Sequence, residues 1–114
     1  LVRSRGLGDV YKRQPVMLMD EPDSALDFLN RHMVLSKIRE LIKEENKAGL
    51  ITLHDPNFAM AYCDRLLLLR EGRLVGELDM RRAKADEVKK KLSLIYGDIE
   101  LLQSGDSFLM GKAL

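Results

Sequence analysis

The sequence is poor in the residues that often define a protein class by composition. Its 114 residues include no tryptophan, one cysteine and three prolines. A single cysteine cannot form a disulfide within the chain, so we expect a reducing cytoplasm and a small packed side chain at Cys63. No apolar run approaches the roughly 20 residues of a membrane-spanning helix. With 46% hydrophobic and 32% charged residues, the composition is that of a soluble globular protein.

A large excess of charge of either sign is also missing. The net charge is +1, from 19 basic and 18 acidic residues. The first fourteen residues hold four of the basic residues and one of the acids, which leaves 15 basic and 17 acidic residues in the remainder. A chain without a basic face does not attract phosphate backbones, and we therefore expect no nucleic-acid partner.

The segment "VMLMDEPDSALD", residues 16–27, carries the clearest chemical signal. Four apolar residues lead directly into a segment with four acids, Asp20, Glu21, Asp23 and Asp27. Carboxylates crowded together repel one another and resist dehydration unless a cation or hydrogen-bond donors compensate. The end of this apolar strand is therefore a candidate site for a cation and phosphates.

A second apolar stretch, "LITLH" at residues 50–54, also ends in polar residues, His54 and Asp55. The helical period between the two stretches predicts a strand–helix–strand unit, and so an α/β fold with parallel strands. Because the carboxyl ends of parallel strands meet at one edge of a sheet, we expect Asp20 and Glu21 to lie near His54. We also expect the first strand to be buried on both faces.

Periodicity and turn residues predict the remaining elements. Asp27 is the expected N-cap of the long helix, Gly49 is expected to stop this helix directly after its last residue, and Asp55 should cap the next helix. The long helix should pack through residues that include Leu29, Met33 and Ile38. The other predicted elements are a short helix at 57–64, strands at 67–70 and 74–78 around a turn at 71–72, a helix at 86–95 and a strand at 99–102. The tail, residues 104–114, gives no clear signal.

The acids and the histidine suit nucleotide hydrolysis. An aspartate at the end of a strand can hold Mg²⁺, and a following glutamate can orient or deprotonate an attacking water. A histidine on the neighbouring strand can donate to a γ-phosphate as charge develops there. A metal-dependent hydrolase that uses Asp20, Glu21, His54 and Asp55 as ligands is an alternative interpretation.

Taken together, these motifs resemble those of ABC-type ATPases. The segment "VMLMDEPDSALD" resembles their Walker B and D-loop segment, and "LITLHDPNFAMAYCDRLLLLREGRLV" resembles their H-loop and the strands after it. The resemblance implies that Asp20 holds magnesium through water, that Glu21 is the catalytic glutamate, and that His54 is the switch histidine at the ATP γ-phosphate. Ser24 and Asp27 then belong to the D-loop at the interface of a head-to-tail dimer.

The resemblance runs from residue 15 to about residue 102 and implies a partial P-loop NTPase (ABC ATPase) core with parallel strands and a C-terminal hairpin. Asp23 departs from it, because a threonine is usual there and the aspartate adds negative charge beside the site. The phosphate-binding loop (Walker A), glutamine loop and signature motif are not present in these residues. We therefore interpret residues 15–114 as the C-terminal part of a nucleotide-binding domain, and expect it to be inactive by itself.

Residues 1–14 show neither helical nor alternating apolar periodicity. From Ser4 to Gln14 the sequence "SRGLGDVYKRQ" matches the translation of a transposase sequencing adapter without interruption. We therefore expect residues 1–14 to be an adapter-derived, non-native tail, residues 4–14 to pack poorly, and the protein's own sequence to begin near Pro15.

Two segments resemble a narrower group, the ATPases that drive uptake of iron–siderophore, haem, cobalamin and similar metal chelates. These are "HDPNFAMAYCDRLLLLREGR" and "LIYGDIELL". The resemblance implies ATP and Mg²⁺ as cofactors, and a cytoplasmic protein peripheral to the inner face of the cell membrane. Its implied partners are the permease transmembrane subunits, a second ATPase subunit and, indirectly, a substrate-binding protein. A non-transport ABC-type ATPase and a non-catalytic interaction fragment stay open as alternatives.

Overall fold

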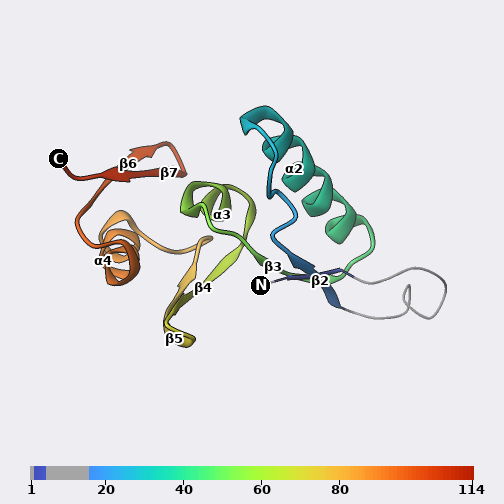
Figure 1. Cartoon of the computed structure of the whole chain (residues 1–114), viewed down its shortest axis with the longest axis horizontal. Coiled ribbons are helices and arrows are strands. Elements are labelled where there is room, and N and C mark those ends of the chain that lie inside the picture. Colours follow the sequence, from blue (N-terminus) through green and yellow to red (C-terminus); the bar gives the residue numbers. More distant parts are fainter. Residues whose placement is uncertain (1, 5–15) are drawn as a thin grey trace. The chain divides into compact units, whose positions relative to one another are not determined.

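The computed structural model describes residues 2–4 and 16–114. The chain divides into two compact units, Leu1–His54 and Asp55–Leu114, which are described separately. Strands and helices are mixed in both units, as the sequence predicts (Figure 1). Of the expected tail, residues 2–4 lie in a strand, whereas residues 1 and 5–14 lie outside the described residues.

The first unit contains a three-stranded sheet in the order β1-β2-β3. Strand β2 (Val16–Asp20) pairs in parallel with β3 (Ala48–Thr52), and Asp20 lies opposite Thr52 at the end of the ladder. Strand β1 (Val2–Ser4) is antiparallel to β2, with an irregularity between its second and third residues. The predicted parallel pairing of the two strands at the candidate site is thus confirmed.

Helix α2 (Phe28–Glu44) connects these parallel strands. Its expected N-cap is confirmed, since the Asp27 side chain accepts a hydrogen bond of 2.8 Å from the Asn30 N–H. The expected end at Gly49 is wrong. The helix stops at Glu44, and Asn46 takes the positive φ of 51° that commonly follows a helix end.

Strand β3 therefore begins and ends two residues earlier than expected. Gly49 lies inside it, and His54 lies two residues beyond its last residue, in a bend. This shift follows from the early helix end, because the chain is free to extend from Ala48. The histidine is consequently presented by a connecting segment and not by the strand itself.

The expected burial of the first unit is partly wrong. Leu35 and Ile38 form the buried stripe of α2, whereas Leu29 and Met33 are 67% and 61% exposed. Leu18 on β2 is 51% exposed, so this strand is not buried on both faces. The reason is that one helix, α2, accompanies the sheet in the described part of this unit, and one helix cannot cover two faces (Figure 1).

The second unit consists of two helices and two antiparallel hairpins. Its elements are α3 (Pro56–Tyr62), β4 (Arg65–Arg70), β5 (Arg73–Asp79), α4 (Ala85–Tyr96), β6 (Ile99–Ser104) and β7 (Ser107–Lys112). The predicted turn at Glu71 and Gly72 joins β4 and β5, and both residues have the positive φ of a tight hairpin turn, 51° and 75°.

Two features of this unit differ from the sequence prediction. Strand β4 does not extend the parallel sheet, because it pairs with β5. The tail without a clear signal contains β7, which pairs with β6 across a turn at Gly105. Phe108 and Met110 alternate with more exposed neighbours along β7, which is the period-two pattern that could have identified this strand.

A contiguous apolar core holds the second unit together. Its buried members come from both helices and both hairpins: Met60, Leu66, Leu68, Leu78, Val88, Leu92, Ile99 and Phe108. Cys63 packs against this cluster, as expected for a small apolar side chain. Helix α4 ends at Gly97, whose φ of 74° favours glycine, so its predicted C-terminus is confirmed.

Candidate functional site

The candidate site lies where β2 and β3 end side by side. The Thr52 hydroxyl donates to Oδ1 of Asp20 and accepts a hydrogen bond of 2.8 Å from the Glu21 N–H. The same N–H lies 3.2 Å from the Thr52 carbonyl oxygen. Thr52 therefore fixes both acids at the strand end. Thr52 is not among the residues predicted from the sequence, although a hydroxyl residue opposite Asp20 in a parallel register was the available signal.

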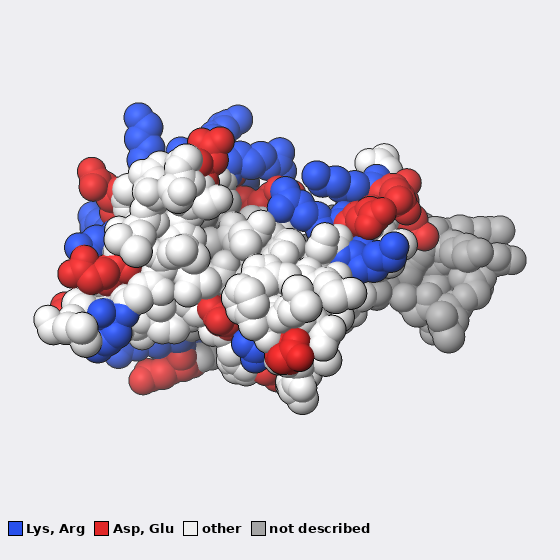
Figure 2. Space-filling model, turned by 90° about the horizontal axis from the view of Figure 1, so that it is seen from above, with Lys and Arg blue, Asp and Glu red and all other residues white. Residues whose placement is uncertain are grey.

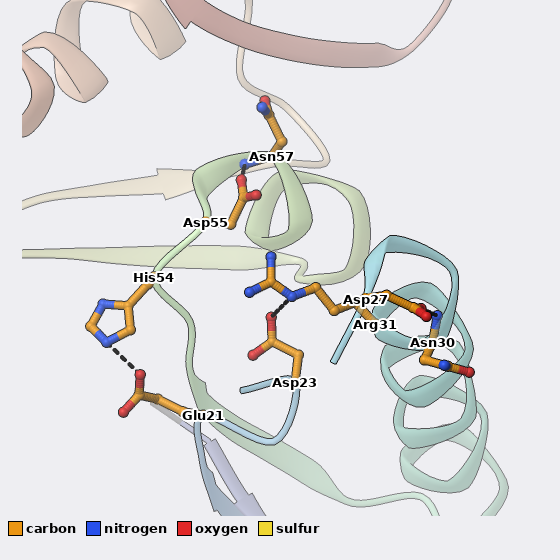
Figure 3. A network of polar contacts seen from close by, with 8 residues as sticks. All are labelled: Glu21, Asp23, Asp27, Asn30, Arg31, His54, Asp55 and Asn57. Atoms are coloured by element: carbon orange, nitrogen blue, oxygen red, sulfur yellow. Dashed lines mark hydrogen bonds and ion pairs between the residues drawn. The ribbon is translucent and has the colours of Figure 1, made fainter. Parts of the chain in front are cut away.

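Glu21 and His54 lie close together, as we expected from the parallel pairing of the two strands that precede them. Their side chains point toward one another, and Nε2 of His54 makes a close polar contact with Oε1 of Glu21 (Figure 3). The histidine side chain is 87% exposed and the glutamate side chain 38% exposed. Both groups therefore remain open to a ligand that approaches from solvent.

The backbone of Glu21 is in an unusual conformation. Its φ is 45°, in the left-handed region that residues with a Cβ rarely adopt. Such a conformation costs on the order of 1 kcal/mol and persists only where surrounding contacts hold it. The bond from its N–H to the Thr52 hydroxyl is one such contact.

Asp23, the residue that departs from the resemblance, is 5% exposed. Oδ2 of Asp23 lies 3.8 Å from Nε of Arg31, one turn into α2 (Figure 3). A buried carboxylate is costly unless a cation or hydrogen-bond donors compensate it. Arg31 offsets the extra negative charge beside the candidate site, and this partner is not predicted from the sequence.

Ser24 and Asp27 lie on the loop between β2 and α2, and both are exposed. The Ser24 N–H donates to the Glu21 carbonyl oxygen at 3.1 Å, which closes the first turn of the loop. Asp27 caps α2, so the geometry already gives it a local structural role. Asp55 does the same for α3, because its side chain accepts a 2.8 Å hydrogen bond from the Asn57 N–H.

The donor set suits magnesium better than a tightly held transition metal. Among residues 2–4 and 16–114, no group of three or more His, Cys, Asp and Glu side chains is placed to hold a metal ion. Asp20 is exposed and offers one carboxylate next to a hydroxyl. Mg²⁺ is commonly held by one or two carboxylates while water and phosphate oxygens complete its shell, so these residues fit it.

Surface charge and hydropathy add two observations. Basic and acidic side chains both lie on the face drawn in Figure 2, and uncharged residues make up much of that face. In the part of the chain that the structure describes, no helix is both long and apolar enough to cross a membrane.

Comparison with known proteins relates the chain to ATP-binding subunits of ABC importers, which are ATPases. The hemin import ATP-binding protein HmuV of Vibrio cholerae is 38% identical over 85 residues, which cover 75% of this chain and 32% of that protein. HmuV of Pseudomonas aeruginosa is 43% identical over 72 residues, which cover 61% and 28%. The phosphonates import ATP-binding protein PhnC 3 of a Nostoc species is 33% identical over 102 residues, which cover 89% and 37%. The chain thus spans about a third of the length of these relatives. No protein-family model matches it.

Proposed function

We propose that this chain is part of the nucleotide-binding domain of an ABC importer ATPase with a P-loop NTPase core. The observation that carries this proposal is the pairing of Glu21 with His54 at the end of the parallel strands. Its further support is the similarity to importer ATP-binding subunits over most of the chain. ATP and Mg²⁺ are the proposed cofactors.

Each side chain of the site has a distinct proposed role. Asp20 holds the magnesium ion through water, and the ion supplies charge neutralisation at the phosphates. Glu21 orients and deprotonates the attacking water, and its exposure leaves room for that water. His54 donates to the γ-phosphate from Nε2, the atom that faces Glu21 in this structure. Thr52 holds the strand end in place, because its hydroxyl donates to the Asp20 carboxylate and accepts from the Glu21 backbone N–H.

The loop that follows is proposed to contact a second copy of the domain. Ser24 and Asp27 are exposed there, and both belong to the segment that resembles a D-loop. The other proposed partners are permease transmembrane subunits, with a substrate-binding protein acting indirectly. The proposed location is the cytoplasmic face of the cell membrane.

Haem, iron–siderophore or cobalamin-type metal chelates are the proposed cargo class. The hemin import proteins among the relatives support haem in particular, and the two segments that resemble chelate importers, "HDPN" and "LIYG", point the same way. The phosphonate import protein matches more of the chain at lower identity, so cargo choice needs a direct test. Uptake of haem against phosphonate by cells that carry the complete transporter distinguishes the two.

The Glu21→Gln substitution in the complete protein tests the proposed activity. Magnesium-dependent ATP hydrolysis should fall at least about 100-fold while nucleotide binding persists, because the carboxylate activates water and does not hold the nucleotide. His54→Ala should also lower turnover strongly. Glu100→Gln, an exposed acid on β6, and His32→Ala on α2 are matched controls that should leave turnover near normal. Normal turnover in both site variants would refute the assigned roles.

A further inference from the structure

A single hydroxyl group connects the two acids at the end of β2. Oγ1 of Thr52 accepts a hydrogen bond of 2.8 Å from the Glu21 N–H and donates to Oδ1 of Asp20. A threonine hydroxyl carries one proton, so once a lone pair accepts from the backbone N–H, that proton is free to point at the carboxylate. The bonds therefore form a directed chain from the Glu21 backbone through Thr52 to the Asp20 carboxylate.

The register of the parallel strands explains this chain of bonds. Asp20 and Thr52 are paired at the last position of β2 and β3, although they are 32 positions apart in the sequence. Threonine is branched at Cβ, which restricts its χ1 angle and so limits the directions that Oγ1 can take. All three residues belong to the first compact unit, so the whole chain of bonds lies within one unit.

The bond to Thr52 determines how Asp20 presents its carboxylate. Asp20 is exposed at the end of its strand, and the terminal torsion of an aspartate is broad, so little else orients its two oxygens. An ionised carboxylate has lone pairs on both oxygens. Because Oδ1 is engaged by the Thr52 hydroxyl, Oδ2 is the oxygen left for an ion or for water bound to that ion.

The other bond of the hydroxyl holds the backbone of Glu21. Its φ of 45° is unfavourable for a residue with a Cβ and needs contacts that maintain it. Thr52 supplies two acceptors for the Glu21 N–H, the hydroxyl at 2.8 Å and the carbonyl oxygen at 3.2 Å. Without the hydroxyl, the longer bond would act alone, and the backbone that carries the Glu21 carboxylate toward His54 would be held less firmly.

We propose that Thr52 is a positioning residue that sets the place of the metal ion relative to the water-activating carboxylate. It acts through Asp20 on the ion and through the Glu21 backbone on the attacking water. Loss of this one hydroxyl should therefore weaken metal binding and slow hydrolysis together. This inference rests on the proposed function of the two acids, whereas the restraint on the Glu21 backbone does not.

Thr52→Val in the complete protein removes the hydroxyl and keeps a side chain branched at Cβ. Exchange of the Glu21 backbone amide, followed by NMR, should quicken on the order of tenfold. Mn²⁺, used as a probe for Mg²⁺ together with a non-hydrolysable ATP analogue, should bind roughly tenfold more weakly, because partners of a metal-side carboxylate tune its affinity. The kcat for ATP should fall on the order of tenfold or more, with KM within about twofold.

Two further variants serve as controls. Thr52→Ser keeps the hydroxyl and should bring all three measurements close to those of the unmodified protein. Ser93→Ala removes a hydroxyl that also donates to the backbone, at 2.7 Å from the Lys89 carbonyl oxygen, but in the second unit, and it should change none of them. If Thr52→Val does not fold, Thr52→Ala makes the same comparison with a smaller side chain.

The outcomes separate this proposal from the proposed function. Unchanged exchange at Glu21 in Thr52→Val overturns the positioning role, and so does a change in only one or neither of Mn²⁺ binding and kcat. Equal losses in Thr52→Ser and Thr52→Val show that the hydroxyl is not responsible and overturn it as well. Absence of both ATP hydrolysis and Mn²⁺ binding in the unmodified protein overturns the proposed function, while the exchange data still decide whether Thr52 restrains Glu21.

Discussion

The two compact units of this chain differ in what holds them together. The second unit contains a core of eight buried apolar side chains drawn from both its helices and both its hairpins. In the described part of the first unit, the buried side chains are Met17, Leu35, Ile38 and the charged Asp23. Yet the first unit carries Asp20, Glu21 and His54. The candidate chemistry is thus built where apolar packing is thin and polar contacts fix the backbone, and the well-packed unit begins one residue after the histidine.

The largest expected difference between the two units is in the loss of stability when a buried leucine is replaced by alanine. Leu92 is 0% exposed in the second unit, and Leu92→Ala should lower the free energy of unfolding by about 3 kcal/mol through lost contacts and a cavity. Leu35→Ala, at a 2% exposed position of the first unit, should cost less because fewer buried side chains surround it. Urea unfolding followed by hydrogen exchange in each unit measures both. Leu94→Ala, at a 46% exposed position of the same helix as Leu92, is the control. Equal losses of unfolding free energy in Leu35→Ala and Leu92→Ala would contradict the inference that apolar packing is weaker in the first unit.

Ion pairs should show how far the first unit depends on polar contacts. Arg31→Met leaves the buried Asp23 carboxylate without its nearby cation and should cost about 2 kcal/mol of unfolding free energy. The pair of Lys37 and Glu40 has the same 3.8 Å separation, but its side chains are 70% and 56% exposed. Lys37→Met should therefore cost under about 0.5 kcal/mol. Thermal unfolding of the two variants tests this, and similar losses would show that burial of Asp23 is unimportant.

A smaller effect is expected at the contact between α4 and β5. Nζ of Lys91 donates to the Glu77 carbonyl oxygen at 2.6 Å. Lys91→Met should cost about 1 kcal/mol of unfolding free energy through this bond, and Lys90→Met, at an exposed neighbouring position, about zero. Chemical denaturation of both variants gives the difference. An equal effect at the two lysines would contradict the contact.

The smallest expected effect is a decrease in the stability of the second unit at alkaline pH. Burial raises the pKa of Tyr96 above its ordinary value of 10.0, and Asp55 adds to this shift. The folded state therefore retains the phenol proton to higher pH than the unfolded state does, and stability is lost as pH rises above 10. Tyr96→Phe should remove this loss, and Asp55→Asn should reduce it. Unfolding measured between neutral and strongly alkaline pH checks both; the same alkaline loss in Tyr96→Phe would place the titration elsewhere.

The sequence predicted those parts of the fold that depend on local periodicity and turn chemistry. The Asp27 and Asp55 caps, the turn at Glu71 and Gly72, and the end of α4 at Gly97 are confirmed because each needs a particular residue at one backbone position. The helix end at Glu44 was not predicted, because glycine is the stronger stop signal, whereas here Asn46 takes the positive φ just after the helix. Strand β7 was missed because its pattern is short and its pairing with β6 is a tertiary feature.

Only one part of the candidate site could be predicted from the sequence, namely the part that follows from the strand–helix–strand order of the first unit. Parallel strands bring Glu21 close to His54, and that proximity was expected before the structure. The contacts of Thr52 and Arg31 were not expected, because each joins residues that no local pattern links. The resemblance to ABC-type ATPases assigned roles to the first group of residues and drew attention to Asp23 without revealing its partner.

The pairing of β1 with β2 has a practical consequence for producing this protein. Residues 2–4 lie hydrogen-bonded alongside the strand that ends in Asp20, with Val2 opposite Met19. A purification tag or fluorescent fusion attached ahead of Val2 is therefore joined directly to a strand that pairs with β2. Its size would disturb the pairing of β1 with the strand that ends in Asp20. Leu114 at the other end is fully exposed and lies outside any strand. Tags, immobilisation linkers and dyes are therefore better attached after Leu114, and assays that compare the two placements reveal how far the first strand influences the site.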